Sequence, residues 1–274
     1  MHCIYINLAE QLDRRHALEA NFLKNNQNNW TLKRYEAVDT KFVHEQEIKG
    51  KSQPAEKACF LSHIGALKKS EKYPGPVMII EDDSIMGQKT QNIIDNLINT
   101  LDPLSWDMMY TDVIITDIHE MILLYKVRRA QFKNDLVTVM NLRQMPTFAG
   151  SAAYVINGSS KGKLLNLLTS VKNFDTPYDM VLRQLIWDQK INACVTFPFV
   201  TTGSPLSQSS QIQNQKKAIT DLTCDLFRKL IWAERSVEEI QEALADLDQK
   251  LVDRETAAFA DLLKLALSSN FLYI

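Results

Sequence analysis

The stretch that decides the fold is residues 76–86, which read PVMIIEDDSIM. The apolar run at 77–80 is typical of a strand buried on both faces of a parallel sheet. Three carboxylates follow at once, Glu81, Asp82 and Asp83. Open α/β sheets bind ligands beyond the carboxyl ends of their strands, and adjacent like charges favour a bound cation, most simply a divalent metal ion. The alternative is that one or two of these acids cap a following turn or helix.

The composition is that of a soluble globular protein, with 45% hydrophobic and 23% charged residues in a chain of 274. A net charge of −2 argues against a nucleic-acid-binding protein that depends on phosphate neutralisation. No apolar run reaches the ~20 residues of a membrane-spanning helix. The N-terminus enters a predicted strand without a charged leader, and the four cysteines fit neither a zinc nor a disulfide pattern. We therefore predict a reduced, cytoplasmic protein.

Strand and helix patterns alternate as far as about residue 215. Apolar runs predict further strands at 2–8, 30–38, 106–110, 147–156 and 191–199, and a β-hairpin over 119–141. Amphipathic patterns predict helices at 13–24, 55–70 and 90–101, and others that begin at 158–160 and 176–179. The polar segments 40–54 and 204–214 are predicted to be loops, the second of them mobile. This order predicts an α/β domain over 1–215, with one mixed sheet flanked by helices.

From residue 218 onward the pattern is wholly helical, which predicts a helical appendage over 216–274. Its first helix is amphipathic, with basic residues beside the apolar face: Lys216, Lys217, Arg228 and Lys229. Such a helix can lie on an anionic membrane surface. A short heptad seam follows at Val237, Ile240, Leu244, Leu247 and Leu251, which would allow two subunits to pair. In the third interpretation both helices bury their apolar faces against the α/β domain.

Several common site motifs are absent from the chain. Without a Gly-rich phosphate loop, a P-loop enzyme and a dinucleotide-binding Rossmann protein are both disfavoured. Without G-x-S-x-G, the usual hydrolase nucleophile elbow is disfavoured as well. A two-component receiver domain also carries adjacent acids after a strand, but near the start of its chain and not at residue 81.

Short motifs in a fixed order carry a resemblance to a known family. They are INL at 6–8, DRR at 13–15, AVD at 37–39, CFLSH at 59–63, IIEDDS at 79–84, TFAGSAAYVI at 147–156 and PYD at 177–179. With these motifs the chain resembles glycosyltransferase family 25, the lipooligosaccharide galactosyltransferases of Gram-negative bacteria and the related collagen sugar transferases. The resemblance covers about residues 2–215. One departure is AEKAC at 55–59, where the family usually carries glycines, so Lys57 is expected to change the surface near the donor pocket.

The resemblance implies a GT-A-like fold and a UDP-sugar donor, with UDP-galactose favoured. It also implies a lipooligosaccharide or other glycan acceptor, and Mn²⁺ or Mg²⁺ held at a D-x-D-type motif. Asp83 is the expected direct metal ligand. Glu81 is expected to contact the metal ion, its bound water or the ribose, and Asp82 is expected to be an orienting residue. An alternative of a different class is a catalytically inactive nucleotide-sugar-binding scaffold that acts through its helical tail.

Further residues are expected to bind the donor: Asn7, Arg14, Arg15, Asp39, Ser62, His63 and Gly150. Arg14 and Arg15 could hold the pyrophosphate bidentately, or one of them could lie on a solvated helix face. Asp39 could contact the nucleoside or cap the end of a strand. His63 could be functional or a satisfied structural histidine. Gly150 allows a close approach of backbone or ligand.

Family members of this kind invert the anomeric centre, which requires a carboxylate to take the proton of the acceptor hydroxyl. Asp179 is the candidate base, since it heads a helix just beyond a predicted substrate-binding strand. The alternative is that Asp179 only stabilises the positive end of that helix. Asp112 is the reserve candidate.

Overall fold

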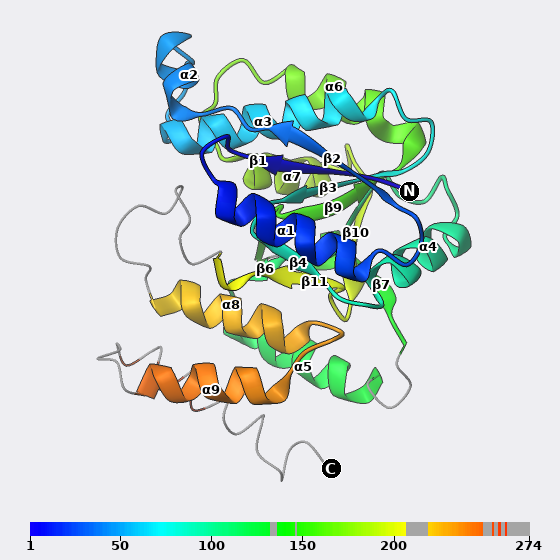
Figure 1. Cartoon of the computed structure of the whole chain (residues 1–274), viewed down its shortest axis with the longest axis vertical. Coiled ribbons are helices and arrows are strands. Elements are labelled where there is room, and N and C mark those ends of the chain that lie inside the picture. Colours follow the sequence, from blue (N-terminus) through cyan, green and yellow to red (C-terminus); the bar gives the residue numbers. More distant parts are fainter. Residues whose placement is uncertain are drawn as a thin grey trace.

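The structure, a computed structural model, describes residues 1–131, 136–145, 147–206 and 219–248, together with 254, 257, 258 and 261 (Figure 1). In this part of the chain, seven strands form a mixed sheet in the order β2-β1-β3-β9-β5-β10-β7. Helices flank the sheet, and two short two-stranded sheets pair β4 with β11 and β6 with β8. The predicted α/β class, with one large mixed sheet flanked by helices and further helices after it, is confirmed.

The elements of the main sheet are β1 (His2–Asn7), β2 (Thr31–Glu36), β3 (Val77–Glu81), β5 (Met108–Tyr110), β7 (Thr138–Asn141), β9 (Ala153–Ile156) and β10 (Ala193–Phe197). The short pairs are β4 (Ser84–Met86) with β11 (Thr201–Gly203), and β6 (Ile114–Ile115) with β8 (Phe148–Ala149). The helices are α1 (Leu12–Asn25), α2 (Thr40–Glu45), α3 (Pro54–Ser70), α4 (Thr90–Thr100), α5 (Ile118–Gln131), α6 (Lys161–Thr169), α7 (Tyr178–Trp187), α8 (Ile219–Ile231) and α9 (Val237–Asp248). Two 3-10 turns, η2 (Leu142–Gln144) and η3 (Gly158–Ser160), complete the described elements.

Strand β3 lies where the sheet changes from parallel to antiparallel. It runs parallel to β1, with Ile6 opposite Glu81, and antiparallel to β9, with Ile80 opposite Ala153. Because parallel strands end at the same edge of a sheet, the carboxyl ends of β1 and β3 deliver Asn7 and the acids to one place. The wholly parallel environment expected for this strand is therefore wrong on one side, although all four apolar residues are buried as predicted.

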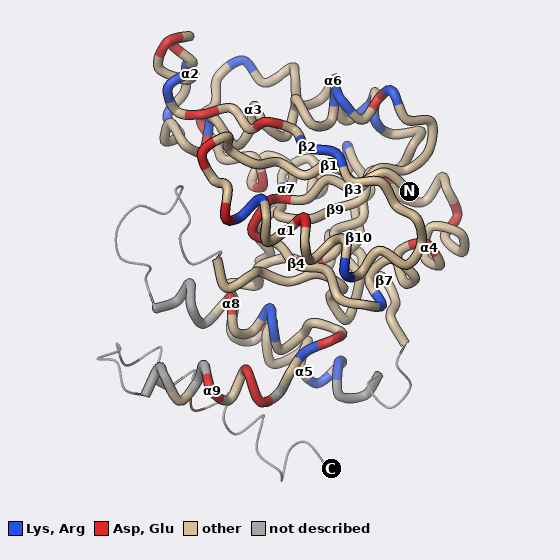
Figure 2. Tube along the Cα trace, viewed as in Figure 1, with Lys and Arg blue, Asp and Glu red and all other residues tan. Residues whose placement is uncertain are grey.

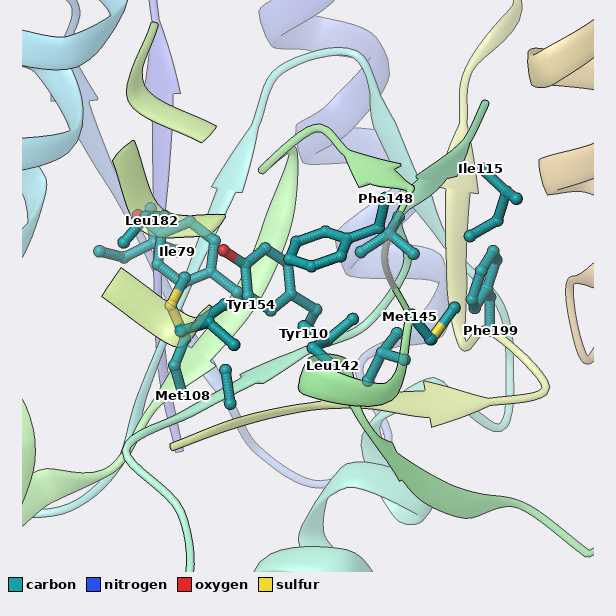
Figure 3. Close-up of a cluster of buried hydrophobic side chains, with 14 of the residues drawn as sticks. Ile79, Met108, Tyr110, Ile115, Leu142, Met145, Phe148, Tyr154, Leu182 and Phe199 are labelled. Carbon is teal, nitrogen blue, oxygen red and sulfur yellow. The ribbon is translucent and has the colours of Figure 1, made fainter. Parts of the chain in front are cut away.

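The apolar run of β3 supplies both faces of the sheet, since successive side chains of a strand point to opposite sides. Val77 and Ile79 pack in one core cluster with Phe60 of α3, whereas Met78 and Ile80 pack in a second cluster with α1. Figure 3 shows part of the first cluster, in which Ile79, Tyr110, Tyr154 and Leu182 come from four different elements. Helices on both faces therefore fix the strand that carries the acids.

Two local predictions are wrong. The segment predicted as the first strand of a hairpin is helix α5, in which Met121, Leu124, Tyr125 and Arg128 are buried at helical spacing. Its continuous apolar run is ambiguous between the two structures, and only β7 remains as a strand, paired with β10. The predicted loop 40–54 contains α2, and the predicted last strand is followed by β11.

Helix α8 packs against the short strands β6 and β11 and against α5, and α9 packs against α8. Figure 1 shows these three helices together at the bottom of the molecule. The first core cluster includes Leu226, Phe227, Leu230 and Ile231 of α8 and Ile240 of α9. This confirms the core-packing interpretation for these residues. Arg228, counted among the surface basic residues from sequence, is instead buried. None of the described helices combines the length and the apolar character that crossing a membrane requires.

Several predictions for this part of the chain fall outside the described residues. They concern the mobile loop over 207–214, the basic pair Lys216 and Lys217, and the last seam residue Leu251. The side chains of Val237, Leu244 and Leu247 are not described either. The heptad seam and the domain boundary at 215 therefore stay predictions.

Candidate active site

A pocket opens at the carboxyl ends of β1 and β3, between α1, α3 and the segment that follows β2. It brings together eight of the predicted site residues: Asn7, Arg14, Asp39, Ser62, His63, Glu81, Asp82 and Asp83. The other four predicted residues, Arg15, Asp112, Gly150 and Asp179, do not line it. Eight of the twelve residues predicted from sequence therefore line one pocket, and the other four lie outside its lining.

Arg14 is the protein's own cation at the acid run. Its Nη2 lies 2.5 Å from Asp83 Oδ2 and its Nη1 lies 3.3 Å from Asp82 Oδ1. Asn7 Nδ2 donates to Asp82 Oδ2 at 2.7 Å. Burial and the charge of Glu81 nevertheless raise the pKa of Asp83 to about 6, against the opposing effect of Arg14. One guanidinium is thus too little to offset the negative charge of three adjacent carboxyl groups.

His63 connects the acids to a buried tyrosine pair. Its Nε2 lies 3.3 Å from Glu81 Oε1, and its Nδ1 lies 2.8 Å from Tyr154 Oη, which in turn lies 3.0 Å from Tyr178 Oη. The His63 ring stacks on Tyr178 with 4.2 Å between centroids. Burial raises the pKa of Glu81, but the hydrogen bond and charge of His63 outweigh it and leave this pKa lowered. His63 is therefore a fixed structural histidine whose ring also faces the pocket.

Asp39 and Ser62 shape the wall nearest to β2. Asp39 Oδ1 accepts the backbone N–H of Phe42 at 2.7 Å and so caps the start of helix α2, where the alternative considered from sequence was a cap at the end of a strand. Ser62 Oγ accepts the backbone N–H of Val38 at 2.8 Å and donates to Ala58 O at 2.7 Å. Ser62 thus joins α3 to the segment that carries Asp39 and fixes this side of the pocket.

Arg15 occupies the solvated face considered for one of the two arginines, because its Nε pairs with Glu19 at 3.1 Å and 37% of its side chain is exposed. Asp179 and Gly150 are brought together, since Asp179 Oδ2 accepts the backbone N–H of Gly150 at 2.8 Å. Gly150 has a φ of 82°, a conformation that favours glycine. Asp179 directly follows Tyr178, whose ring stacks on the pocket residue His63 with 4.2 Å between centroids.

Asp112 is sequestered by the C-terminal helices. It is 1% exposed, and its Oδ2 accepts from Arg228 Nε at 2.8 Å and from Arg228 Nη2 at 2.5 Å. Burial raises the pKa of Asp112, although Arg228 opposes this shift. Sequence reasoning missed Arg228, since it shows only as one basic residue beside an apolar helical face.

This ion pair predicts a stability effect. Replacing Arg228 with Met leaves the Asp112 carboxylate buried without its partner, and we expect the free energy of unfolding to fall by about 3 kcal/mol. Urea unfolding measures this loss in the free energy of unfolding. Lys229→Met, on the same helix, is the matched control. The double variant Asp112→Asn/Arg228→Met should recover most of the loss. Equal stability of Arg228→Met and Lys229→Met would contradict the role of the pair.

Two residues of the motif around α3 differ from expectation. Cys59 lines the pocket, although no pattern in the sequence singles it out as a site residue. Lys57, expected to change the donor-pocket surface, does not line the pocket: its Nζ donates to Ile48 O at 2.9 Å and the residue is 9% exposed. On α3, the residues Ala55 and Ala58 line the pocket together with Cys59.

Comparison with known proteins identifies the family of the chain. Among solved structures, mouse xyloside xylosyltransferase 1 in its apo form is 8% identical, with a TM-score of 0.37 over 69% of this chain and 70% of that one. No curated protein matches the chain. The model of glycosyltransferase family 25, described as an LPS biosynthesis protein, matches residues 1–182, from β1 into α7, and so includes every residue that lines the pocket. The chain therefore belongs to glycosyltransferase family 25.

Proposed function

We propose that this glycosyltransferase is an inverting enzyme that transfers a hexose from a UDP-sugar to a sugar of lipooligosaccharide or lipopolysaccharide. The observation that supports it is the convergence of eight predicted site residues in one pocket, inside the segment that matches the family. Galactose, in β-linkage, is the favoured hexose because the resemblance is to galactosyltransferases. An acceptor of this class would place the reaction at the cytoplasmic face of the inner membrane.

Arg14 is the residue best placed to meet the diphosphate of the donor. Its Nη atoms hold Asp82 and Asp83, while its buried Nε has no hydrogen-bond partner among the described residues. A buried N–H without an acceptor costs about 1–3 kcal/mol, which a phosphate oxygen in the pocket would recover. Asn7 and Asp39 line the same pocket and complete the proposed donor contacts.

The acids fit a divalent cation that shares its ligands with the donor. Mg²⁺ is usually held by one or two carboxylates together with substrate phosphates, and Glu81 and Asp83 offer two carboxylates in the pocket. The pKa of Asp83 is raised by burial first and then by the negative charge of Glu81, which Arg14 opposes without cancelling. When bound, Mn²⁺ or Mg²⁺ would stabilise the charge that develops on the leaving UDP.

Asp179 is the proposed base for the acceptor hydroxyl. Its two carboxylate oxygens accept the backbone N–H groups of Gly150, at 2.8 Å, and Met180, at 2.9 Å. These two hydrogen bonds hold the carboxylate in a fixed orientation, which a positioned general base needs. Asp112 ranks behind it because Arg228 holds its Oδ2 through two N–H groups.

A thermal-shift screen tests donor binding. We expect one UDP-sugar, UDP-galactose first, to stabilise the protein in the presence of Mn²⁺, by about 2.7 kcal/mol when its concentration is a hundred times the dissociation constant. The same UDP-sugar with EDTA, and GDP-mannose with Mn²⁺, are the controls. If no UDP-sugar raises the melting temperature with Mn²⁺, the proposed donor class is wrong.

The second candidate is an inactive nucleotide-sugar-binding scaffold that acts through its C-terminal helices. It predicts the same thermal shift but no sugar transfer to any glycan acceptor. The apolar residues described on α8 already pack in the core, so they are not free to pair subunits or to enter a membrane. Figure 2 shows acidic and basic residues interspersed along the described chain, so charge distribution gives no separate reason to expect nucleic acid or a membrane as partner.

A further inference from the structure

Three side chains of different chemistry meet at the wall of the pocket. Cys59 and His63 are four residues apart on α3 and so lie on the same side of the helix, one turn from each other. Glu81 comes from the end of β3. The cysteine sulfur, an imidazole nitrogen of His63 and a carboxylate oxygen of Glu81 all lie within 4.8 Å of one another.

The spacing of these atoms is close to that of a zinc site. Bonds of about 2.0–2.3 Å in a tetrahedron place neighbouring ligand atoms about 3.3–3.7 Å apart. His63 Nε2 and Glu81 Oε1 are already 3.3 Å apart. Because the Cys59 sulfur lies within 4.8 Å of the other two atoms, it would have to approach by at most about 1 Å, which a side-chain rotation can supply. Three protein ligands with a fourth position open is the pattern of zinc sites that remain accessible to small molecules.

The surroundings hold His63 in the orientation that such a site needs. A histidine that binds metal through one ring nitrogen usually donates the other N–H to a fixed acceptor. Nδ1 of His63 lies 2.8 Å from Tyr154 Oη, and the ring stacks at an interplanar angle of 7° on Tyr178. When Nδ1–H is donated to Tyr154, Nε2 can present a lone pair to a metal ion held between it and Glu81, and that ion would replace the Nε2–Glu81 hydrogen bond.

The charge around the cysteine also favours a cation. The carboxylates of Glu81 and Asp83 line the same pocket as the Cys59 thiol. Their negative charge attracts a metal ion. Metal binding would replace the thiol proton, which passes to solvent, so that a metal–sulfur bond forms as the S–H bond breaks.

We propose that Cys59, His63 and Glu81 form a binding site for zinc or a similar borderline transition metal inside the donor pocket. Thiolate and imidazole ligands select such metals over Mg²⁺ and Mn²⁺, which prefer oxygen. One consequence rests on the proposed function: zinc on Glu81 takes a carboxylate from the donor site, so zinc and UDP-sugar compete. Zinc binding is then an inhibitory control of the enzyme.

Cobalt is the probe for this site, because Co²⁺ adopts zinc-like geometry and is visible by absorption. Titration of the metal-free full chain with Co²⁺, without nucleotide, should give a thiolate-to-cobalt charge-transfer band that saturates at one equivalent and is removed by Zn²⁺. Cys59→Ser should lose this band. His63→Gln should weaken Co²⁺ binding by at least about tenfold. Cys224→Ser, the same change at a half-buried thiol on α8, is the matched control and should keep the band.

The results separate this site from the proposed function. Three outcomes would each overturn the zinc site: absence of the band in the wild-type protein, its survival in Cys59→Ser, or its loss in Cys224→Ser. Circular dichroism checks that each variant is folded. Cobalt binding without any UDP-sugar binding would leave the zinc site standing and remove the donor. UDP-sugar binding that zinc does not weaken, in a protein with the expected band, would overturn the competition.

Discussion

Replacing Asp83 with Asn should lower sugar transfer by at least about 10²-fold while the protein stays folded. The variant removes a proposed metal ligand without removing an apolar side chain from the core. Burial and Glu81 raise the pKa of Asp83 to about 6, above its ordinary value of 3.8, so the ionised side chain lowers the stability of the folded state at neutral pH. Because Asn is neutral and of the same size, the Asp83→Asn variant is expected to unfold at no lower temperature than the wild-type protein.

Calorimetry and a transfer assay check this expectation together. UDP should bind the wild-type protein more tightly with Mn²⁺ than with EDTA, and Asp83→Asn should lose that difference. Asp188→Asn, at the C-terminal end of α7 and away from the pocket, is the matched control and should behave as wild type. If Asp83→Asn retains normal metal-dependent UDP binding, Asp83 is not a metal ligand and its charge only pairs with Arg14.

The position of the site follows from local sequence features. The run at 77–80 is apolar without a break, so it had to be buried on both faces, and the acids directly after it had to lie at a strand end. The short strand before Asn7 has the same character, and parallel pairing of the two strands joins their ends. For these residues, periodicity and chain order were enough to predict the pocket.

The partners of the charged residues could not be predicted in the same way. Arg14 and Asp83 are 69 positions apart, and Asp112 and Arg228 are 116 positions apart. No local pattern shows which distant cation a buried carboxylate will meet, because that depends on how the helices pack. For the same reason α5 was taken for a strand: its apolar run fits either structure, and packing against α8 decides it.

Replacing Asp179 with Asn should lower transfer to the acceptor by about 10²–10⁴-fold, the usual contribution of a general base, while donor binding is retained. The amide oxygen of Asn can still accept the backbone N–H of Gly150, so the start of α7 and the turn at Gly150 should keep their structure. What the variant loses is the ability to take a proton. A fall in kcat without a change in the affinity for UDP-sugar is therefore the expected signature.

Asp175→Asn supplies the control for this experiment, because Asp175 is an exposed aspartate four residues earlier that accepts the backbone N–H of Lys51 at 2.8 Å. It should transfer sugar at the wild-type rate. If Asp179→Asn stays within a few-fold of wild type, Asp179 only holds Gly150 and the helix end, and Asp112 becomes the carboxylate to test. Asp112→Asn must then be compared with Asp112→Asn/Arg228→Met, since only a loss of activity common to both belongs to proton transfer and not to the ion pair.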